Sequence, residues 1–333
     1  MYRNHSVGVI VPAYNEQGLV GRVIDTIPGF VDRVYVIDDG STDGTWEEIQ
    51  SHATAMNRQR EVEQVLADGG HQAVVLPFRN ERNLGRGGSV KFGYRKALED
   101  GIDLVAVMDG DGQMDPSVLD RMLDPIVEGR ADYVKGNRLS SRQSWKGMSR
   151  FRLFGNVVLT FLTKASTGYW SVSDSQNGYT AISSRALERI PVDELYDDYG
   201  FLNDILAKCN LKDLRVADVS HSAIYGEEQS TIRYRSFIPH VSLLLFRNFR
   251  ERIKFKYLLL DFHPVVFCYV LAFVAMLIGL FGGAYTAATA AQGVFVRGLL
   301  STLVFLLGTL FLVLALAYDV ELNSHLMANT ERN

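Results

Sequence analysis

Three stretches decide the fold of this 333-residue chain: VGVIVPAYNE at residues 7–16, VYVIDDGSTDGT at residues 34–45 and LVAVMDGDGQ at residues 104–113. Each opens with a short apolar run and ends in polar or acidic residues. Such runs are typical of strands that are buried on both faces of a sheet. Helical patterns lie between them, and a further strand is expected: helices at 20–27, 45–67 and 88–99, and a strand at 74–76. Strands that alternate with helices predict βαβ units and a mainly parallel sheet, an α/β fold.

The residues that follow these strands are candidates for a ligand site, because ligands of parallel sheets bind outside the carboxyl ends of the strands. They are Pro12, Tyr14 and Glu16 after the first strand, Asp38 and Asp39 after the second, and Asp109, Asp111 and Gln113 after the last. A single loop of this kind is also explained as a helix cap, since Ser41, Thr42 and Asp43 suit that role. Three such loops at one edge favour a ligand site.

The sharpest feature is the pair Asp109 and Asp111, separated by one glycine. Two carboxylates at this spacing can approach one hard cation, and Mg²⁺ or Mn²⁺ is usually held by one or two carboxylates together with substrate phosphates. Gln113 offers a further carbonyl oxygen. Asp38 and Asp39 cannot both be metal ligands without crowding, so one of them is predicted to bind a nucleotide base or ribose.

A glycine-rich stretch, NLGRGGS at residues 83–89, precedes the third helix. It resembles a phosphate-binding loop but lacks the Gly-Lys-Ser/Thr ending of an ATP-binding loop. The polar stretch Asn57–Gly70 is unusually long and has no assigned function.

The C-terminal part reads as a membrane anchor. Val265–Ala291 and Leu299–Tyr318 contain 27 and 20 residues without a formal charge, and roughly 20 apolar residues span a bilayer. A pair of buried core helices is the alternative. Residues 236–260 interleave aromatic and basic residues, which predicts an amphipathic helix at the membrane interface.

Charge and cysteine content indicate the kind of partner and the cellular compartment. The formal net charge of −4 gives no indication of a nucleic-acid partner. Cys209 and Cys268 lack metal-ligand spacing and are expected to be unpaired in a reducing compartment. The N-terminus does not read as a signal peptide. Basic residues precede the first span: Arg247, Arg250, Arg252, Lys254 and Lys256. They predict that both termini and the catalytic domain are cytoplasmic, at the inner or plasma membrane.

Together, the motifs VIVPAYNE, VIDDGSTDGT, NLGRGGSVKFGYRKA and MDGDGQ resemble glycosyltransferase family 2 over residues 7–235. The resemblance implies a GT-A fold, in which a Rossmann-like nucleotide-binding half is joined to an acceptor half. With two spans the chain is most similar to the polyprenyl-phosphate glycosyltransferases, the dolichol-phosphate mannose synthase group. These transfer one sugar from a nucleotide-sugar to a lipid phosphate with inversion.

The resemblance also implies roles for individual residues. The nucleotide-sugar would be bound by Pro12, Tyr14, Glu16, Asp38, Asp39, Asp109, Arg138 and Arg233. The metal would be held by Asp109, Asp111 and Gln113, and the acceptor phosphate by Arg150 or Arg152. Ser175–Tyr179 matches an acceptor-side turn. Asp111 and Asp204 would be the catalytic carboxylates; a lipid phosphate is already ionised, so Asp204 would orient the acceptor or a basic side chain, or be structural.

One departure from the motifs of this group bears on which sugar is transferred. Mannose synthases of this group carry an Arg-x-x-Gly-x-Ser-Lys pattern, whereas this chain has Tyr225–Thr231, with Arg233 beyond it. Arg233 either replaces that contact or faces lipid headgroups. UDP-glucose or UDP-N-acetylglucosamine is therefore favoured over a mannose donor.

The expected organisation is a catalytic domain at 1–235, a juxtamembrane segment at 236–260, a two-helix anchor at 261–320 and a cytoplasmic tail at 321–333. The expected partners are a nucleotide-sugar, a polyprenyl or dolichyl phosphate and the bilayer. Relatives of this kind often form homo-oligomers, and that alternative stays open. Two other functions compete with this one. The first is extension of a polysaccharide or lipid-linked glycan, against which the absence of Gln-x-x-Arg-Trp speaks. The second is a non-enzymatic membrane scaffold.

Overall fold

The computed structural model describes residues 1–66, 74–138, 150–198, 200–221, 234–260, 262–289 and 293–328. The chain divides into two compact units. The first comprises Met1–Asn248 together with Leu326–Asn333, and the second comprises Phe249–His325.

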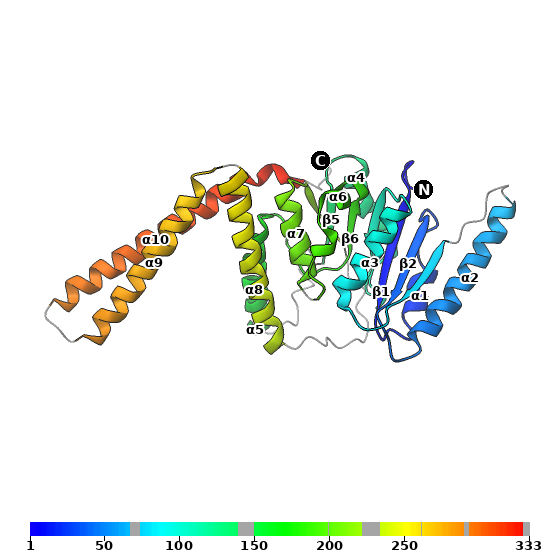
Figure 1. Ribbon diagram of the computed structural model, residues 1–333, viewed down its shortest axis with the longest axis horizontal. Coiled ribbons are helices and arrows are strands. Elements are labelled where there is room, and N and C mark those ends of the chain that lie inside the picture. The colour runs from blue at the N-terminus through cyan, green and yellow to red at the C-terminus, as the bar shows by residue number, and fades with distance from the viewer. Residues whose placement is uncertain are drawn as a thin grey trace. The chain divides into compact units, whose positions relative to one another are not determined.

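In the described part of the first unit, eight strands form one sheet in the order β3-β2-β1-β4-β6-β5-β7-β8 (Figure 1). The strands are β1 Val7–Ala13, β2 Arg33–Asp38, β3 Val75–Arg79, β4 Leu104–Val107, β5 Tyr133–Asn137, β6 Thr180–Ser183, β7 Val216–Ser220 and β8 Met327–Ala328. β6 runs antiparallel to β4 and β5, and the other neighbours are parallel. The predicted mixed, mainly parallel sheet is confirmed.

Helices cover both faces of this sheet, as in other three-layer α/β folds. One face packs against α1 Val20–Asp25, α2 Thr45–Leu66 and α4 Leu119–Val127, and the other against α3 Gly85–Glu99, α6 Ser184–Arg189 and α7 Phe201–Leu211. Val7, Val9 and Val11 enter the first core, whereas Ile10 enters the second. This alternation explains why every residue of β1 is buried.

Two strands, β5 and β7, carry little of the apolar signal that marks β1, β2 and β4. β5 contains Lys135 and Asn137, both buried, and β7 contains Asp218. These polar side chains have partners on other elements. The strands are therefore buried without the apolar sequence pattern from which a buried strand is predicted. Two further helices, α5 Arg150–Thr167 and α8 Tyr234–Arg252, lie side by side, where Ser166 Oγ donates to Leu245 O at 2.8 Å.

Asn57, in the polar stretch without an assigned function, covers the start of edge strand β3. Its Oδ1 accepts from Val74 N at 2.9 Å and Val75 N at 2.8 Å, and its Nδ2 donates to Val75 O at 2.8 Å. The side chain thus takes the place of a neighbouring strand at an edge whose backbone groups would otherwise be unpaired. The rest of the stretch from residue 67 lies outside the described residues.

We predict that Asn57→Ala lowers the free energy of unfolding by about 1–3 kcal/mol, because it leaves buried backbone groups of β3 without partners. Thermal unfolding of the detergent-solubilised protein measures this. Thr54→Ala is a matched control on the same helix, since Thr54 is exposed and its hydrogen bond among the described residues lies within the helix, to Gln50 O. Equal melting temperatures for the two variants would contradict the assignment.

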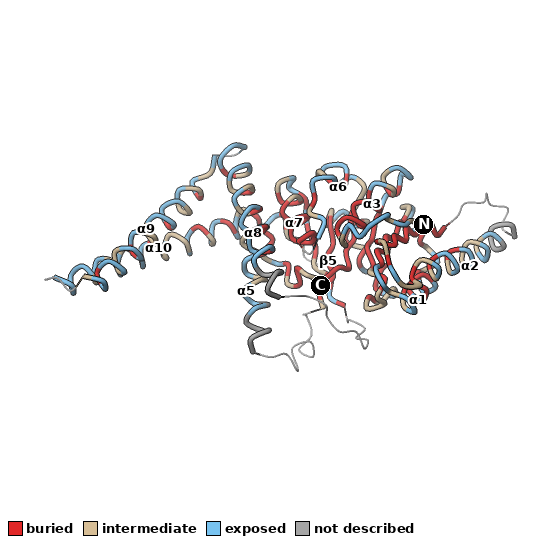
Figure 2. Tube along the Cα trace, turned by 60° about the horizontal axis from the view of Figure 1, so that its bottom comes forward, coloured by how far each residue is buried: buried red, intermediate tan, exposed pale blue. Residues whose placement is uncertain are grey.

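The second unit contains two long apolar helices, α9 Val265–Ala288 and α10 Val294–Leu322. Their most apolar windows are only 17% and 11% buried, and Figure 2 shows both helices as mainly exposed. A soluble core helix would be mostly buried, so this apolar surface suits lipid. Gly279 and Gly308 lie at the contact between the helices, where an added Cβ would come within 2.6 Å of Phe305 N and 2.7 Å of Met276 N, respectively. The chain is a membrane protein.

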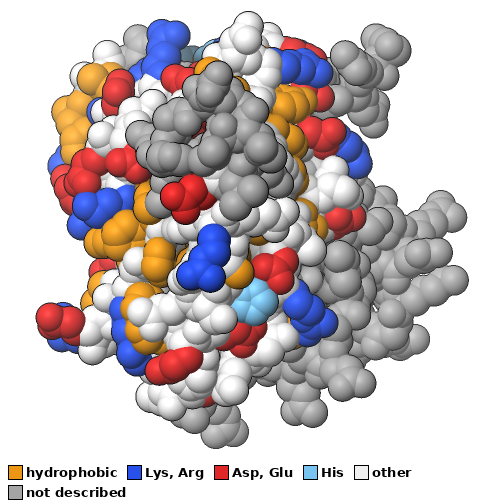
Figure 3. Space-filling model, turned by 90° about the vertical axis from the view of Figure 1, so that its right-hand side faces the viewer, with side chains coloured by type: hydrophobic (Ala, Val, Ile, Leu, Met, Phe, Trp, Pro, Cys, Tyr) orange, Lys and Arg blue, Asp and Glu red, His pale blue; other side chains and the backbone are white. Residues whose placement is uncertain are grey.

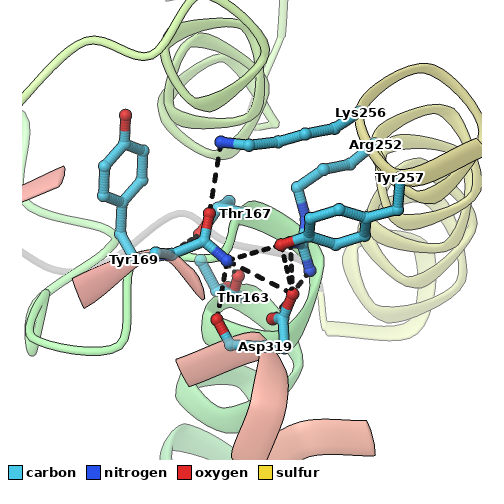
Figure 4. Close-up of polar contacts among 8 residues, drawn as sticks. Thr163, Thr167, Tyr169, Arg252, Lys256, Tyr257 and Asp319 are labelled. Carbon is cyan, nitrogen blue, oxygen red and sulfur yellow. Dashed lines mark hydrogen bonds and ion pairs between the residues drawn. The ribbon is translucent and has the colours of Figure 1, made fainter. Parts of the chain in front are cut away.

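A buried polar network joins the beginning and the end of this unit (Figure 4). Arg252 donates from Nη1 to Asp319 Oδ1 at 2.7 Å and from Nη2 to Oδ2 at 3.0 Å. Tyr257, in the π-helical segment η4 Ile253–Leu260, donates to Asp319 Oδ1 at 2.7 Å and accepts from Asn323 Nδ2 at 2.7 Å. Arg252, Asp319 and Asn323 are fully buried. The Arg252–Asp319 ion pair connects the segment before α9 to the last turns of α10.

Candidate active site

The three loops predicted to share one edge of the sheet are joined to one another by hydrogen bonds. Gly110 N donates to Pro12 O at 3.0 Å, and Asp39 N donates to Ala13 O at 2.8 Å. The hydroxyl of Ser41 accepts from Asn15 N at 2.9 Å. Parallel pairing of β1 with β2 and β4 produces this arrangement, because it places the three carboxyl ends together.

Asp38 and Asp39 are both buried, and each has protein partners. Asp38 forms an ion pair with Arg79 at 3.0 Å and accepts from Ser41 N at 3.0 Å. Asp39 Oδ1 accepts from Asn80 Nδ2 at 2.7 Å and from Leu84 N at 2.9 Å. These contacts hold the second loop in place. Of the first-loop candidates, Pro12 is buried, Glu16 is half-buried and Tyr14 is 44% exposed.

Asp109 lies in a polar cluster that sequence reasoning did not anticipate. Arg86 Nε donates to Asp109 Oδ1 at 2.8 Å, and Arg86 Nη2 donates to Gly178 O at 3.0 Å. A Cβ on Gly178 would lie 2.5 Å from Asp109 Oδ2. The cluster therefore joins the first acidic residue of Asp-x-Asp to the turn before β6.

Asp111 and Gln113 share a tight turn. Gln113 N donates to Asp111 Oδ1 at 3.0 Å, and Gly112 adopts a φ of 73° that favours glycine. Among the described residues, no group of three or more His, Cys, Asp or Glu is placed to hold a metal. The two half-buried carboxylates fit a hard cation that takes its remaining oxygens from a diphosphate, as Mg²⁺ commonly does.

Glycines within residues 83–89 lie against the backbone of Tyr196 and Asp197. A Cβ on Gly85 would lie 2.8 Å from Asp197 O, and one on Gly87 would collide with the carbonyl oxygens of Tyr196 and Asp197. Gly88 N donates to Asp197 O at 3.1 Å. These glycines admit a neighbouring stretch of backbone, and the same close approach places Arg86 beside Asp109.

The other half of the sheet contributes a second polar cluster, at the carboxyl ends of β5 and β7. Arg138 donates through Nε and Nη2 to the two oxygens of Asp174, at 2.9 and 3.3 Å. Asp218 Oδ2 accepts from Asn137 Nδ2 at 3.0 Å and Ser173 N at 3.1 Å. Burial lowers the pKa of Lys135 to about 7, against the attraction of Asp174. Burial raises the pKa of Asp218 to about 6.

The raised pKa of Asp218 predicts a pH dependence of stability. The folded state binds this proton more tightly than the unfolded state, so the contribution is complete below about pH 3.8 and is lost as pH rises through about 6. We expect the melting temperature of the wild type, relative to Asp218→Asn, to fall between about pH 4 and about pH 7. Thermal unfolding across this range measures the difference, and a constant offset would contradict the prediction.

Asp204, predicted as a second catalytic carboxylate, is fully buried on α7. Its Oδ2 accepts from Tyr196 N at 3.0 Å, and its Oδ1 lies 4.0 Å from Arg247 Nη2 of α8. Burial raises the pKa of this carboxyl group, with Lys208 opposing the shift. The position suits a group that orients Arg247 better than one that meets a substrate directly.

Some predicted residues cannot be placed. Arg150 and Arg152 lie in the first turn of α5, but their side chains are outside the described residues, as is the whole of Arg233. On the face that Figure 3 shows, the described Lys and Arg side chains are interspersed with Asp and Glu.

Residues 8–191 match the family model described as glycosyl transferase family 2, which is more than half of the chain. The chain belongs to glycosyl transferase family 2. The expectation from the motifs is thereby confirmed, and family 2 membership makes the protein a transferase.

Curated family 2 relatives bear names that agree with the motifs. The UDP-N-acetylglucosamine–dolichyl-phosphate N-acetylglucosaminyltransferase of Methanococcus voltae is 29% identical over 220 residues, which are 66% of this chain and 86% of that protein. The undecaprenyl-phosphate mannosyltransferase of Micrococcus luteus is 28% identical over 63% of this chain and 80% of that protein. Mannosyl-3-phosphoglycerate synthase from Rubrobacter xylanophilus has the same fold, with a TM-score of 0.50, 20% identity and 78% of each chain covered. The GT-A-like fold is confirmed.

Proposed function

We propose that this family 2 transferase moves a single sugar from a nucleotide-sugar, with inversion at the anomeric carbon, to the phosphate of a polyprenyl or dolichyl phosphate. The observation that carries the proposal is the joining of three acidic or polar strand ends at one sheet edge, in a chain that also has two exposed apolar helices. The first feature suits a diphosphate leaving group, and the second suits an acceptor dissolved in the membrane. The names of the relatives support the same acceptor class.

The chemistry assigned to the chain is a direct displacement. An oxygen of the lipid phosphate attacks the anomeric carbon, while the bond from that carbon to the donor diphosphate breaks and its electron pair leaves with the nucleoside diphosphate. When bound, Mg²⁺ or Mn²⁺ would neutralise charge on that leaving group, held by Asp109 and Asp111 with Gln113 beside them. Arg86 keeps the Asp109 carboxylate in place.

The acceptor requires orientation more than deprotonation. The second pKa of a phosphate monoester is about 6, so the attacking oxygen is already ionised near neutrality. Asp204, buried and close to Arg247, is therefore assigned an orienting role. Arg138 would bind donor phosphate, and Arg150 or Arg152 the acceptor phosphate. Within the nucleotide site, Asp39 would lie near the ribose or base, and the exposed Tyr14 would also contact the nucleotide.

The donor is proposed to be a UDP-sugar, with N-acetylglucosamine favoured and glucose as the alternative. The name of the Methanococcus voltae relative supports the first sugar. The mannose-type basic pattern is missing from Tyr225–Thr231, which speaks against a GDP-mannose donor.

The proposed location is the cell membrane, with the catalytic domain and both termini in the cytoplasm. β8, which follows α10 in the chain, is a strand of the same sheet as β1. The return of the chain to this sheet after α10 supports a topology in which both ends of the helix pair lie on one side of the membrane. The exposed Arg250 supports the cytoplasmic side, whereas Arg252 is neutralised by Asp319.

A donor panel tests the proposal. Purified protein with Mn²⁺ and undecaprenyl or dolichyl phosphate would be offered UDP-N-acetylglucosamine, UDP-glucose, GDP-mannose and UDP-galactose. We expect nucleoside diphosphate release that depends on the lipid and is fastest with UDP-N-acetylglucosamine. Fastest release from GDP-mannose would contradict the donor assignment, and no lipid-dependent release from any donor would contradict the acceptor class.

A further inference from the structure

Asn177, in the turn before β6, is held by hydrogen bonds on several sides and is 1% exposed. Its backbone oxygen accepts from Lys135 Nζ at 2.9 Å, and its Oδ1 accepts from Tyr179 N at 3.1 Å. Its Nδ2 lies 2.6 Å from His221 Nε2. Because Oδ1 takes the Tyr179 amide, Nδ2 is the atom that faces His221 and donates to it. His221 Nε2 is therefore an unprotonated acceptor.

β5 is shaped to receive this side chain. Lys135 is fully buried, although burying an amine is costly, and its described hydrogen bond goes to Asn177 O. The next residue is Gly136, where a Cβ would lie 2.7 Å from His221 Nε2 and 2.8 Å from Asn177 Nδ2. A glycine inside a strand marks a close approach of another group. Here it lets Asn177 and His221 meet over the strand.

The residue after Asn177 connects this cluster to Asp-x-Asp. A Cβ on Gly178 would lie 2.5 Å from both Asp109 Oδ2 and Arg86 Nη2, and Gly178 O accepts from Arg86 Nη2 at 3.0 Å. Arg86 in turn donates to Asp109 Oδ1. A shift of the turn at Asn177 would thus move the groups that hold the Asp109 carboxylate.

We propose that Lys135 and His221 are positioning residues for the donor site. By holding Asn177 from β5 and from the end of β7, they keep Gly178 and Arg86 in register with Asp109. The inference rests on the proposed function, because it takes Asp109 to be a ligand of the cation and donor diphosphate. It assigns to the acceptor half of the sheet a control over metal and diphosphate binding.

The test separates the hydrogen bond at His221 from the bulk of its side chain. His221→Leu removes the acceptor, whereas His221→Gln retains an acceptor oxygen. Tyr169→Phe is the matched control, since Tyr169 is also fully buried and donates to a backbone oxygen, that of Leu214, at the opposite end of β7. The readouts are the Mn²⁺ concentration for half-maximal UDP binding without lipid, the kcat of transfer and the KM for polyprenyl phosphate.

We expect His221→Leu to raise the Mn²⁺ requirement and the Kd for UDP about tenfold, the scale on which partners of ligand residues act, with the lipid KM unchanged. His221→Gln and Tyr169→Phe should remain close to the wild type. Lys135→Met, which removes the second contact, should reproduce the effect of His221→Leu and serves if that variant does not fold.

Wild-type Mn²⁺ requirements in His221→Leu or in a folded Lys135→Met would overturn the inference. Equal losses in His221→Leu and His221→Gln, with lower melting temperatures in both, would also overturn it, because they would indicate a packing role. UDP binding is measured without the lipid. A wild type that binds UDP with Mn²⁺ but transfers no sugar to lipid would therefore contradict the proposed acceptor. The Mn²⁺ requirement of UDP binding in the variants would still decide the present inference.

Discussion

Asp111→Asn is expected to lower the rate of sugar transfer by about 10²–10³-fold, the range measured when one preorganised electrostatic contact to a developing charge is removed. The substitution keeps an acceptor oxygen for Gln113 N, which donates to Asp111 Oδ1 at 3.0 Å, so the turn should persist. Only the negative charge offered to the cation is lost. Initial rates over a range of Mn²⁺ concentrations measure the effect, and the remaining activity should require more metal.

Asp115→Asn is the matched control for this variant. Asp115 lies four residues further along and its carboxylate caps the short helix η1 Pro116–Val118 by accepting from Ser117 N at 2.9 Å. Asparagine caps helices about as well as aspartate, so the control removes the same charge from the same loop without loss of the cap. Near wild-type rates are expected. Equal losses in the two variants, or none in Asp111→Asn, would contradict the role of Asp111.

The largest effect on stability is expected from breaking the Arg252–Asp319 pair. Arg252→Met leaves the buried Asp319 carboxylate without its bidentate partner, and removing one member of a buried pair costs about 3–5 kcal/mol. Thermal unfolding in detergent should show a clear fall in melting temperature. Arg250→Met is the control, because Arg250 is exposed two residues earlier and its loss should have little effect.

The double variant Arg252→Met with Asp319→Leu sharpens this prediction. Replacing both members of a buried ion pair by apolar residues is often neutral or stabilising, so the double variant should be more stable than Arg252→Met alone. A double variant as unstable as the single one, or an Arg252→Met protein that melts like the wild type, would show that the pair is not what holds these segments together.

The half of the sheet that contains β1, β2 and β4 was predictable because its signals are local. Val7–Val11, Val34–Ile37 and Leu104–Met108 are apolar runs that end in polar residues, and strands of this kind form a parallel sheet whose acidic ends meet. The structure places β1, β2 and β4 at those positions and joins their loops through backbone bonds.

The remaining features depend on contacts that no local pattern reports. The role of Arg86 follows from the backbone at Tyr196–Asp197, which is distant in sequence and fills the space above Gly87. β5 escaped prediction because Lys135 is buried against Asn177, a partner 42 residues away. β8 is only two residues long and exists through its pairing with β7. From the sequence alone, Asp319 is the first charged residue after a span, and nothing local predicts its ion pair with Arg252.

Mass spectrometry of the lipid product tests the central claim most directly. After reaction of the full-length protein with UDP-N-acetylglucosamine, Mn²⁺ and polyprenyl phosphate, we predict a product one N-acetylhexosamine heavier than the acceptor, joined through phosphate and absent in Asp111→Asn. A product series with two or more sugars, or transfer to a glycan acceptor but not to polyprenyl phosphate, would contradict the claim and indicate an enzyme that extends a glycan.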